Sequence, residues 1–508
     1  MAEIQKILIA NRGEIALRVI RTCRDMGIPT VAVYSDPDGG SPHVLHADES
    51  VHIGPAASKE SYLVFDKIID AARQTGADAI HPGYGFLSEN GDFAERCRDE
   101  GIRFIGPAAE SIRLMGDKTA ARELMGNADV PFPPGTTDAL KDGEEAERIA
   151  EEIGYPVLIK AAAGGGGKGM RIVSEKKEFQ SGIKAARSEA RNAFGDDRVY
   201  IEKYLVEPRH VEFQIIADGH GNVLHLFDRE CSIQRRHQKV IEEAPCAILT
   251  PELRGEMAEA AVAAARACDY VGAGTVEFLV DKDRNFYFLE MNTRLQVEHP
   301  VTELITGLDL VRLQILVAEE KPLPLAQEDI WRNGHAIECR IYAEDPRDNF
   351  LPSTGKLAKH RFPSGNGVRV DAGVEEGQSV TIDYDPMISK LCTHGKDRDQ
   401  AIRRMLRALD EYEIAGCRTT IPFCRYVLQH EAFLNAEYDT HFVQDHFEPE
   451  RLDEIGEDAG RARFIAAALL KQRRPGTGSA NTSDSDYSAA ASVNSSFSHW
   501  WKNRRELT

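Results

Sequence analysis

Short apolar runs alternate with amphipathic segments along the first third of the chain. The predicted strands are 7–10, 30–34, 77–81 and 103–106, and the predicted helices are 13–26 and 92–100. Strands that alternate with helices in this way are typical of a parallel sheet in an α/β fold. The turn after the first strand has a single glycine, Gly13, and lacks the G-x-G-x-x-G pattern that binds a dinucleotide, which disfavours an NAD-dependent oxidoreductase.

A glycine-rich loop dominates the second part of the chain. Helices are predicted at 111–125 and 143–153, and strands at 155–160 and 171–173. Between the two strands lie four consecutive glycines followed by Lys168, a run that favours close approach of backbone N–H groups to phosphate. It is not a Walker A loop, because Gly169 and Met170 follow the lysine. We interpret it as a lid over a nucleoside triphosphate, with Lys118 and Lys160 as cationic partners.

The next strand, predicted at 199–205, offers an edge for an adenine ring. The backbone of Lys203 and Leu205, with Glu202 beside them, could supply a donor and an acceptor. Further along, the residues from Gln234 to Lys239 form a cluster of hydrogen-bond donors. In an acidic protein such a cluster suggests anion binding, and a solvated basic turn is the alternative.

Two hairpins and a helix are predicted after this strand. The hairpins pair 210–216 with 223–227 and 274–280 with 286–290, and an amphipathic helix N-capped by Thr250 lies between them. The second hairpin can place Glu277 opposite Glu290 and Asn292. Hard oxygen ligands of this kind suit magnesium when nucleotide phosphates complete the coordination shell.

Polar residues alternate with others from the end of that hairpin onward. They are Glu290, Asn292, Arg294, Gln296 and Glu298. If the segment is extended, one edge presents carboxylates, amides and a guanidinium to a common space. The alternative is a solvated strand face. The remaining predicted elements are helices at 309–319, 398–411 and 422–430, a strand at 334–342, and a β-rich stretch to residue 391. Arg340 lies on the predicted strand, and it could simply pair with Glu338 on the same strand face.

Composition and charge narrow the class of protein. The chain has 508 residues, 42% hydrophobic and 28% charged, which is typical of a globular enzyme with about three packed units. A net charge of −20 argues against a general nucleic-acid surface, and no apolar run is long enough for a membrane span. The nine cysteines are scattered without a C-x-x-C pair, and no signal-peptide pattern precedes the first strand, so a cytoplasmic location is expected.

Six motifs together resemble the biotin carboxylase family of ATP-grasp enzymes. They are A-N-R-G-E-I-A, H-P-G-Y-G-F-L-S-E-N, M-G-D-K, G-G-G-G-K-G-M, R-R-H-Q-K and E-M-N-T-R-L-Q-V-E-H-P-V-T-E, and the resemblance runs from about residue 4 to about 447. It implies a Rossmann-like parallel-sheet domain at 1–110, a helical linker at 111–134, an ATP-grasp lid at 135–205, an ATP-grasp core at 206–330 and a β-rich carboxy-terminal domain at 331–447. The extension at 448–508 lies outside the resemblance, and its composition predicts that it is largely disordered after about 475.

The resemblance also implies a ligase that forms ADP, phosphate and carboxybiotin through carboxyphosphate. By resemblance, ATP would be held by Lys118, Lys160, Gly165, Gly166, Gly167, Lys168, Gly169, Met170, Glu202, Lys203, Leu205, His210, Gln234 and His237, with Glu277 and Glu290. Mg²⁺ or Mn²⁺, as two ions, would bind Glu277, Glu290 and Asn292. Bicarbonate and biotin would contact Lys239, Arg294, Gln296, Val297, Glu298 and Arg340, with Lys239, Arg294, Glu298 and Arg340 as the catalytic set.

Partners follow from the same resemblance. No Met-Lys dipeptide occurs in the sequence, so the family's biotin-acceptor motif is missing and biotin is expected on a separate biotin carboxyl carrier protein. A separate carboxyltransferase subunit and a homodimer are also expected. The acyl-CoA or 2-oxo acid acceptor remains open. One alternative is another ATP-grasp ligase, which would share the lid and the metal hairpin but not the T-R-L-Q-V-E-H-P run or Arg340. The other is a nucleotide-binding regulator without activity, and the presence of Glu277, Glu290, Arg294 and Glu298 argues against it.

The end of the chain yields a testable hypothesis. Residues 475–498 are rich in Gly, Ser, Ala and Asn, and Trp500 and Trp501 follow beside basic residues, as in a docking peptide. We expect that a chain ending at Arg474 no longer co-purifies with the partner subunits, with the full-length chain purified in parallel as the control. Unchanged co-purification of the shortened chain would reject the hypothesis.

Overall fold

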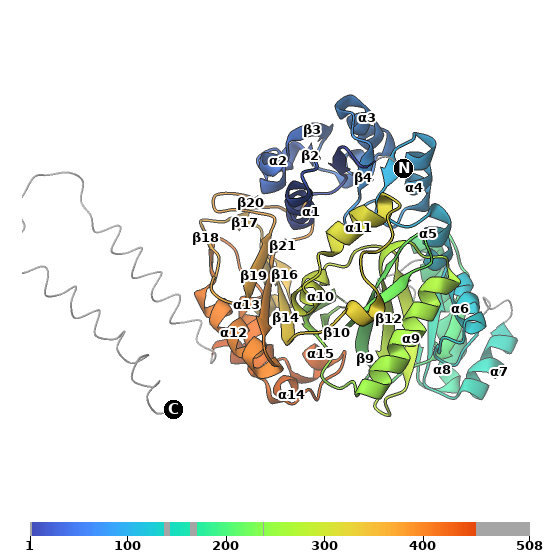
Figure 1. Cartoon of the computed structure of the whole chain (residues 1–508). Coiled ribbons are helices and arrows are strands. Elements are labelled where there is room, and N and C mark those ends of the chain that lie inside the picture. Colours follow the sequence, from blue (N-terminus) through green and yellow to red (C-terminus); the bar gives the residue numbers. More distant parts are fainter. Residues whose placement is uncertain (1–2, 137–142, 163–169, 237, 454–508) are drawn as a thin grey trace, which may run out of the picture. The chain divides into compact units, whose positions relative to one another are not determined.

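The computed structural model describes residues 3–136, 143–162, 170–236 and 238–453 (Figure 1). The sheet of its first domain has five parallel strands. The strand order is β3-β2-β1-β4-β5. The strands are β1 (Ile7–Ile9), β2 (Thr30–Ser35), β3 (Glu49–Gly54), β4 (Ala79–His81) and β5 (Arg103–Phe104), and the helices are α1 (Gly13–Met26), α2 (Pro42–His46), α3 (Phe65–Thr75) and α4 (Gly91–Asp99). Ile7 and Ile9 join one hydrophobic core with α1, whereas Leu8 joins another with α3 and α4. Burial on both faces explains the continuous apolar run and confirms the predicted α/β sheet.

The predicted helix at 111–125 is wrong in one respect, because it is two helices. α5 (Ala109–Gly116) ends before Asp117, and α6 (Lys118–Asn127) begins after it. Asp117 is extended, and its carboxylate accepts hydrogen bonds from the N–H groups of Thr119 and Ala120. An aspartate that caps a helix in this way competes with helix continuation, which accounts for the break.

After α6 the chain forms a small sheet that is covered by two helices. Its elements are α7 (Gly143–Ile153), β6 (Val157–Ala161), β7 (Arg171–Val173), α8 (Lys176–Phe194) and β8 (Val199–Lys203). The strands are antiparallel in the order β7-β6-β8, and Phe179 of the unanticipated helix α8 is buried against Ile159. The glycines and Lys168 of the predicted lid loop, at 163–169, lie outside the described residues.

An antiparallel eight-stranded sheet forms the largest unit, in the order β13-β12-β9-β10-β11-β14-β21-β19. Its strands are β9 (Arg209–Ala217), β10 (Val223–Arg235), β11 (Gln238–Ala244), β12 (Gly272–Val280), β13 (Phe286–Asn292), β14 (His335–Tyr342), β19 (Val368–Ala372) and β21 (Met387–Gly395). Because β11 pairs directly with β14, the sheet crosses the boundary predicted at residue 330. The core segment and the carboxy-terminal segment therefore share one framework.

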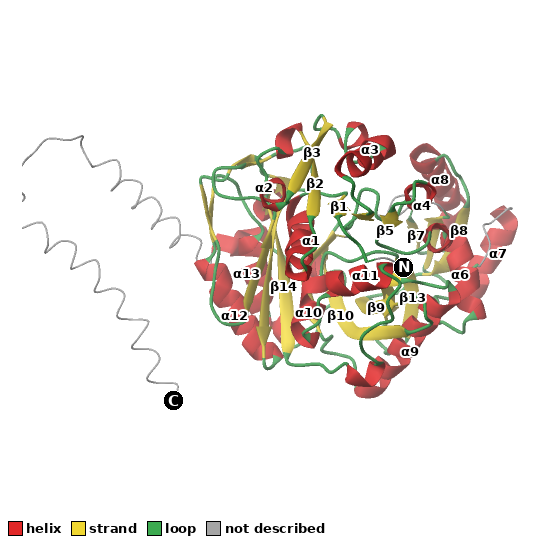
Figure 2. Cartoon of the chain, turned by 45° about the horizontal axis from the view of Figure 1, so that its top comes forward, coloured by secondary structure: helices red, strands yellow, loops and turns green. Residues whose placement is uncertain are grey.

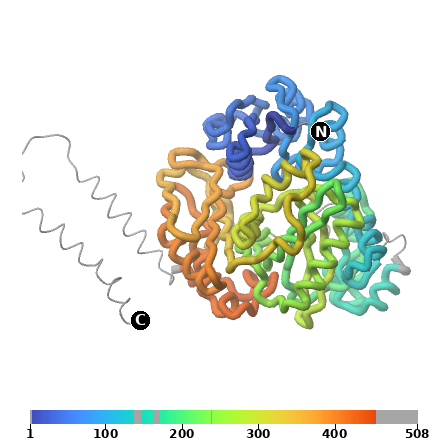
Figure 3. The backbone as a smooth tube through the Cα atoms, in the orientation of Figure 1, coloured from blue at the N-terminus to red at the C-terminus, as the bar shows by residue number. Residues whose placement is uncertain are grey.

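Helices and short strands surround this sheet. They are α9 (Pro251–Ala267), α10 (His299–Thr306), α11 (Leu310–Ala318), α12 (Arg398–Glu411), α13 (Ile421–Gln429), α14 (Glu431–Leu434), α15 (Phe442–His446), β15 (Glu344–Asp345), β16 (Leu351–Pro352), β17 (Gly355–Lys356), β18 (Lys359–Arg361), β20 (Ser379–Val380) and β22 (Glu413–Ala415). Figure 2 shows α9 along the strands β9 and β10, against which it packs. Thr250 caps α9 as predicted. The amino-terminal helix α1 lies beside β19, so a blue segment and an orange segment of the tube lie side by side in Figure 3.

Two further observations bear on the expectations from composition. Among the described residues, no helix has both the length and the apolar character that a bilayer crossing requires. All nine cysteines are free thiols, and eight of them are buried.

We predict that Phe213→Ala destabilises the protein by about 3–5 kcal/mol, the usual cost of truncating a buried aromatic side chain. Phe213 on β9 is completely buried and meets Phe278 edge-to-face, with ring centroids 6.3 Å apart. The shift in chemical unfolding measures the effect. Leu434→Ala is the control, because that side chain is 47% exposed. Equal shifts for the two variants would contradict the prediction.

Candidate active site

A row of charged residues crosses four adjacent strands of the large sheet. Glu290 on β13 faces Glu277 on β12, Glu277 faces Glu212 on β9, and Glu212 faces Arg229 on β10. Directly opposed residues of neighbouring strands project from the same face of a sheet. The predicted pairing of Glu277 with Glu290 is thus confirmed, and the row places three carboxylates side by side.

Lys239 on β11 connects this row to the segment that follows β13. Its Nζ lies 2.5 Å from Glu212 Oε2, 2.9 Å from Glu277 Oε1 and 2.7 Å from Glu298 Oε1. All three carboxylates are buried. Although burial opposes it, their negative charge raises the pKa of Lys239 well above its ordinary value. Lys239 is therefore a permanent cation at the centre of the cluster.

The extended conformation expected from Glu290 to Glu298 is wrong beyond Asn292. β13 ends at Asn292, the chain turns, and Glu298 becomes the N-cap of α10. Pro300 occupies the first turn of that helix, where proline is favoured, and this signal in the sequence was overlooked. The polar side chains still converge, because the turn and the helix start bring Glu298 back toward the sheet.

Hydrogen bonds lock the turn together. Arg294 Nη2 donates to Asn292 Oδ1 at 2.9 Å, and Arg294 Nη1 donates to Gln296 Oε1 at 3.1 Å. The amides of Asn292 and Gln296 in turn donate to Glu277 Oε1, at 2.8 and 3.0 Å. Arg294 Nε is held by Glu89 at 2.7 Å. All three nitrogens of the Arg294 guanidinium therefore donate hydrogen bonds, which fix its position in the turn.

Arg340 lies on the other side of Glu298. Its Nη2 is 2.9 Å from Glu298 Oε2 and its Nε is 2.7 Å from Glu242 Oε1, so the alternative pairing with Glu338 is not what forms. Glu298 is buried, yet Lys239 and Arg340 hold its pKa well below the ordinary value. Glu298 is consequently ionised, and each of its oxygens already accepts from a cation.

The residues expected to hold a nucleotide lie on the lid side of the sheet. Glu202 pairs with Lys160 and, at 2.8 Å, with Arg122. The N–H of Lys203 donates to the Pro134 carbonyl at 2.7 Å, so in this conformation it is not available to an adenine. Leu205 and Met170 are half-buried. His237, Lys168 and the glycines at 165–167 and 169 lie outside the described residues.

His210 links this side to the carboxylate row. Its Nδ1 accepts from the Gln234 amide at 3.0 Å, so the proton is on Nε2, which lies 2.9 Å from Glu277 Oε2. Burial lowers the pKa of His210, but the charge of Glu277 outweighs burial and raises it overall. His210 therefore supports Glu277 as an anion.

The donor set around Glu277 fits a divalent cation. Partial burial and then the charge of Glu277 raise the pKa of Glu290, whose only close cation among the described residues is Lys118 at 3.9 Å. A cation between the two carboxylates would stabilise both. Glu277, Glu290 and the Asn292 oxygen are hard ligands of the kind that magnesium takes. Ligand atoms of His210, Glu212 and Glu277 also lie within 4.8 Å of one another.

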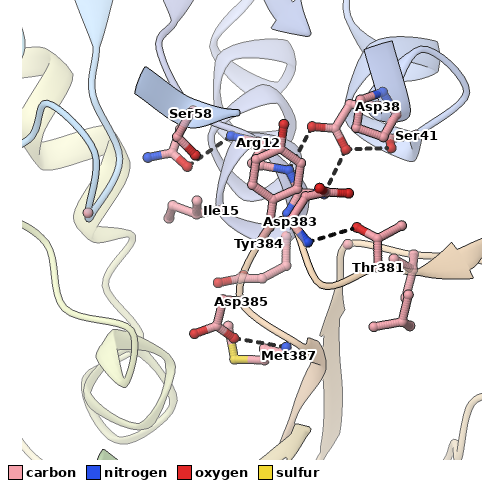
Figure 4. A pocket seen from close by; sticks show the side chains of 18 of the residues that line it. Arg12, Ile15, Asp38, Ser41, Ser58, Thr381, Asp383, Tyr384, Asp385 and Met387 are labelled. Atoms are coloured by element: carbon pink, nitrogen blue, oxygen red, sulfur yellow. Dashed lines mark hydrogen bonds and ion pairs between the residues drawn. The ribbon is translucent and has the colours of Figure 1, made fainter. Parts of the chain in front are cut away.

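Two cavities are lined by residues that surround the cluster. One, of about 490 Å³, is lined by Lys118, Arg122, Tyr200, Glu290 and Asn292. The other, of about 920 Å³, is lined by Arg294, Val297 and Arg340, by the start of α1 and by residues 373–387. Figure 4 shows residues that line the larger cavity, among them Arg12, which is paired with Asp38 and lies 4.0 Å from the centre of the Tyr384 ring. Arg294 lines the larger cavity and its partner Glu89 lines the smaller one, so this ion pair joins the linings of the two cavities.

Sequence reasoning missed several residues of this cluster. Glu212 was not selected, although His210, Glu212 and Gln214 alternate with apolar residues on a strand whose residues are all buried. Buried polar residues at every second position are a signal that could have identified it. Arg229 and Glu242 carried no local signal, because their partners come from distant segments of the chain, whereas Glu89 lies in the motif H-P-G-Y-G-F-L-S-E-N but was not assigned a role.

Comparison with known proteins agrees with this geometry. Residues 3–112 match the family described as biotin carboxylase, N-terminal domain; residues 117–326 match carbamoyl-phosphate synthase L chain, ATP binding domain; and residues 338–445 match biotin carboxylase C-terminal domain. Over 442 residues the chain is 54% identical to biotin carboxylase 1 of Bacillus subtilis, covering 87% of this chain and 98% of that protein. The chain belongs to the biotin carboxylase family.

Other biotin carboxylases and larger carboxylase subunits are also similar. A Campylobacter jejuni biotin carboxylase structure, described as a beta-gamma-ATP complex, matches with a TM-score of 0.85 and 50% identity over 87% of this chain and 99% of that one. The Hydrogenobacter thermophilus 2-oxoglutarate carboxylase biotin carboxylase domain, with MgADP and bicarbonate, has a TM-score of 0.84 and 47% identity over 89% and 99%. The methylcrotonoyl-CoA carboxylase α subunit of Dictyostelium discoideum is 55% identical over 88% of this chain, which spans 64% of that subunit.

We predict that Glu242→Gln changes how stability depends on pH. Burial, partly offset by Arg340, raises the pKa of Glu242 to about 7 from 4.5, so the fold binds a proton that the unfolded chain releases between these values. The contribution of Glu242 is therefore present below about pH 4.5 and lost as the pH rises through 7. As the pH rises from about 4.5 to 7, the unfolding free energy of the variant should increase by about 3 kcal/mol relative to that of the wild type.

The measurement is chemical unfolding of the two proteins at a series of pH values. Glu256→Gln, at an exposed position of α9, is the matched control and should follow the wild type throughout. Parallel pH curves for Glu242→Gln and the wild type would contradict the prediction.

Proposed function

We propose that the chain carboxylates biotin at N1′ in a reaction that consumes ATP and bicarbonate and forms ADP, phosphate and carboxybiotin. One observation carries the proposal: an ionised carboxylate, Glu298, is held between Lys239 and Arg340. Arg294 and Arg340 line one cavity, and Glu290 and Asn292 line another. A base, an anion-binding cation and two separate entrances are what joining a nucleotide-activated oxyacid to a second substrate requires.

The smaller cavity fits the nucleotide. Its lining includes Lys118 and Glu290, and Lys160 and Glu202 stand on the adjoining lid strands. We assign Glu277, Glu290 and Asn292 to Mg²⁺, which when bound would neutralise phosphate charge. The Hydrogenobacter relative binds MgADP and bicarbonate, which supports this assignment. We extend the assignment to two ions, with Mn²⁺ as a substitute.

Bicarbonate fits beside Lys239 and Arg294. An anion there would draw Lys239 away from Glu298, and the pKa of that carboxylate would rise from its depressed value toward the range in which it accepts a proton. Gln296 and the backbone of Val297 complete the set of donors. Glu298 then removes the bicarbonate proton, and the resulting carbonate oxygen attacks the terminal phosphorus of ATP, whose bond to the bridging oxygen breaks so that ADP leaves and carboxyphosphate forms.

Biotin fits the larger cavity. Arg340 lines it and is fixed by Glu242 and Glu298, so its guanidinium is held in place before any substrate arrives. We assign Arg340 to the ureido oxygen of biotin, whose negative charge grows as N1′ attacks CO₂ released from carboxyphosphate. A prearranged cation costs no reorganisation at that moment, which is how oxyanion stabilisation accelerates a reaction.

The partners follow from this assignment. We infer that biotin arrives on a carrier protein, that a separate carboxyltransferase uses the product, and that the chain forms a homodimer in the cytoplasm. The B. subtilis relative is named biotin carboxylase 1, and other relatives are subunits of methylcrotonoyl-CoA, propionyl-CoA and pyruvate carboxylases. The Hydrogenobacter structure is described as a domain dimer.

The test is ATP hydrolysis by the purified chain with and without bicarbonate and free biotin. We expect hydrolysis that depends on bicarbonate and Mg²⁺ and is stimulated by biotin. Hydrolysis that ignores bicarbonate would point to a different ATP-grasp ligase, and the absence of turnover under all conditions would point to a nucleotide-binding regulator.

We predict that Arg340→Ala slows biotin carboxylation by about 10²–10³-fold, the usual cost of losing one oxyanion donor. ATP binding should be retained, because Arg340 lines the larger cavity only. Carboxybiotin formation and nucleotide affinity measure the two effects. Arg361→Ala, whose side chain is 71% exposed, is the control. A fully active Arg340→Ala variant would remove this residue from the mechanism.

A further inference from the structure

A buried lysine stands next to the site without touching the cavities. Lys390 on β21 is directly opposite Arg340 on β14, and its side chain has no exposed surface. Its Nζ donates to the Val297 carbonyl at 2.8 Å and lies 3.2 Å from Glu14 Oε2. Two neighbouring cations of one sheet thus hold consecutive residues of the turn, since Arg340 binds the carboxylate of Glu298.

Glu14 brings the first domain into this arrangement. It is the second residue of α1, and its other oxygen accepts from the hydroxyl of Tyr84. Both residues belong to sequence motifs, A-N-R-G-E-I-A and H-P-G-Y-G-F-L-S-E-N, that the proposed chemistry leaves without a task. Glu89 of the second motif binds the same turn at its other end, accepting from the Thr293 N–H and from Arg294.

Backbone geometry explains what the lysine contact controls. The Gln296 carbonyl accepts from His299 Nδ1 at 2.8 Å, and the next carbonyl, that of Val297, accepts from Lys390. In a trans peptide the N–H points opposite to the carbonyl of the same unit. The N–H groups of Val297 and Glu298 are therefore turned away from His299 and Lys390, and both peptide planes are fixed.

We propose that Lys390, anchored by Glu14, is a positioning residue for the oxyacid site. It fixes the Val297–Glu298 peptide, and through it the donor set and the carboxylate base that bind and deprotonate bicarbonate. This inference rests on the proposed function, and it gives the first domain a part in the reaction: that domain sets the shape of a turn located in another unit of the fold.

A purely electrostatic role is the competing explanation, because a buried lysine also balances the charge of Glu14, its nearest carboxylate. Glu338 and Asp371 face Lys390 as well, and Asp371 is paired with Arg369. Two variants separate the explanations. Lys390→Met removes the donor and leaves Glu14 uncompensated, whereas Glu14→Gln combined with Lys390→Met removes the donor and both charges. If Lys390 positions the turn, both variants remain defective; if it only balances charge, the double variant recovers.

The experiment measures KM for bicarbonate and for ATP in bicarbonate-dependent ATP hydrolysis. We expect KM for bicarbonate to rise about tenfold or more in both variants, with KM for ATP within about twofold of the wild type. Lys396→Met, a change at an exposed lysine that follows the same strand, is the matched control and should behave as wild type. A wild-type KM for bicarbonate in the double variant would overturn the proposal.

Amide hydrogen exchange of the segment 294–298 gives a second readout that needs no turnover. Exchange in this segment should accelerate in the double variant and stay unchanged in Lys396→Met. Unchanged exchange in the double variant would overturn the proposal even where KM rises. If Lys390→Met alone does not fold, the double variant decides. If ATP hydrolysis by the wild type does not depend on bicarbonate, the proposed function is refuted. The exchange rates would still show whether Lys390 fixes the turn.

Discussion

The ammonium group of Lys239 among three buried carboxylates is the interaction on which the site depends. Bringing ionised groups out of water costs several kcal/mol each, and the cost is recovered only where opposite charges and hydrogen bonds meet them at close range. Here Glu212 is also bound by Arg229, Glu277 by His210 and Asn292, and Glu298 by Arg340. Removing any one partner would leave a buried charge without compensation, so the cluster holds together as a unit.

Strand register makes this arrangement possible. Glu290, Glu277, Glu212 and Arg229 are neighbours because four antiparallel strands align them in one row, and a slip of one residue would turn a strand's side chains to the opposite face. The turn after β13 then brings Arg294 and Glu298 to this row of charged residues. Catalytic groups that sit on strands and at a helix start are held more rigidly than groups on long loops.

The sequence predicted most of the fold and much of the site. Strong periodicity fixed helices such as α1, α7 and α12 to the residue, because their apolar faces repeat at helical spacing and are buried. The hairpin pairing of Glu277 with Glu290 followed from a short turn between two apolar strands. Motif resemblance selected residues such as Arg340 whose partners lie far away in the chain.

Long-range partners were harder to foresee. Nothing near Glu14 or Lys390 in the sequence indicates that they meet, since they belong to the first domain and to β21. The helix start at Glu298 was missed because an alternating polar pattern suggested a strand, while Pro300 pointed to a helix. The break at Asp117 was missed because a capping aspartate was read as an interior residue.

The eight-stranded sheet has a consequence for how the chain can be divided. β11 and β14 are internal strands that bond to each other, although residue 330 falls between them in sequence. Separate polypeptides cut at that point would each expose one of these strands with unbonded amides along one border, a surface that recruits other chains. The two halves of this sheet therefore need to be on one polypeptide and to fold together. Insertions are better accommodated in the loops around the sheet.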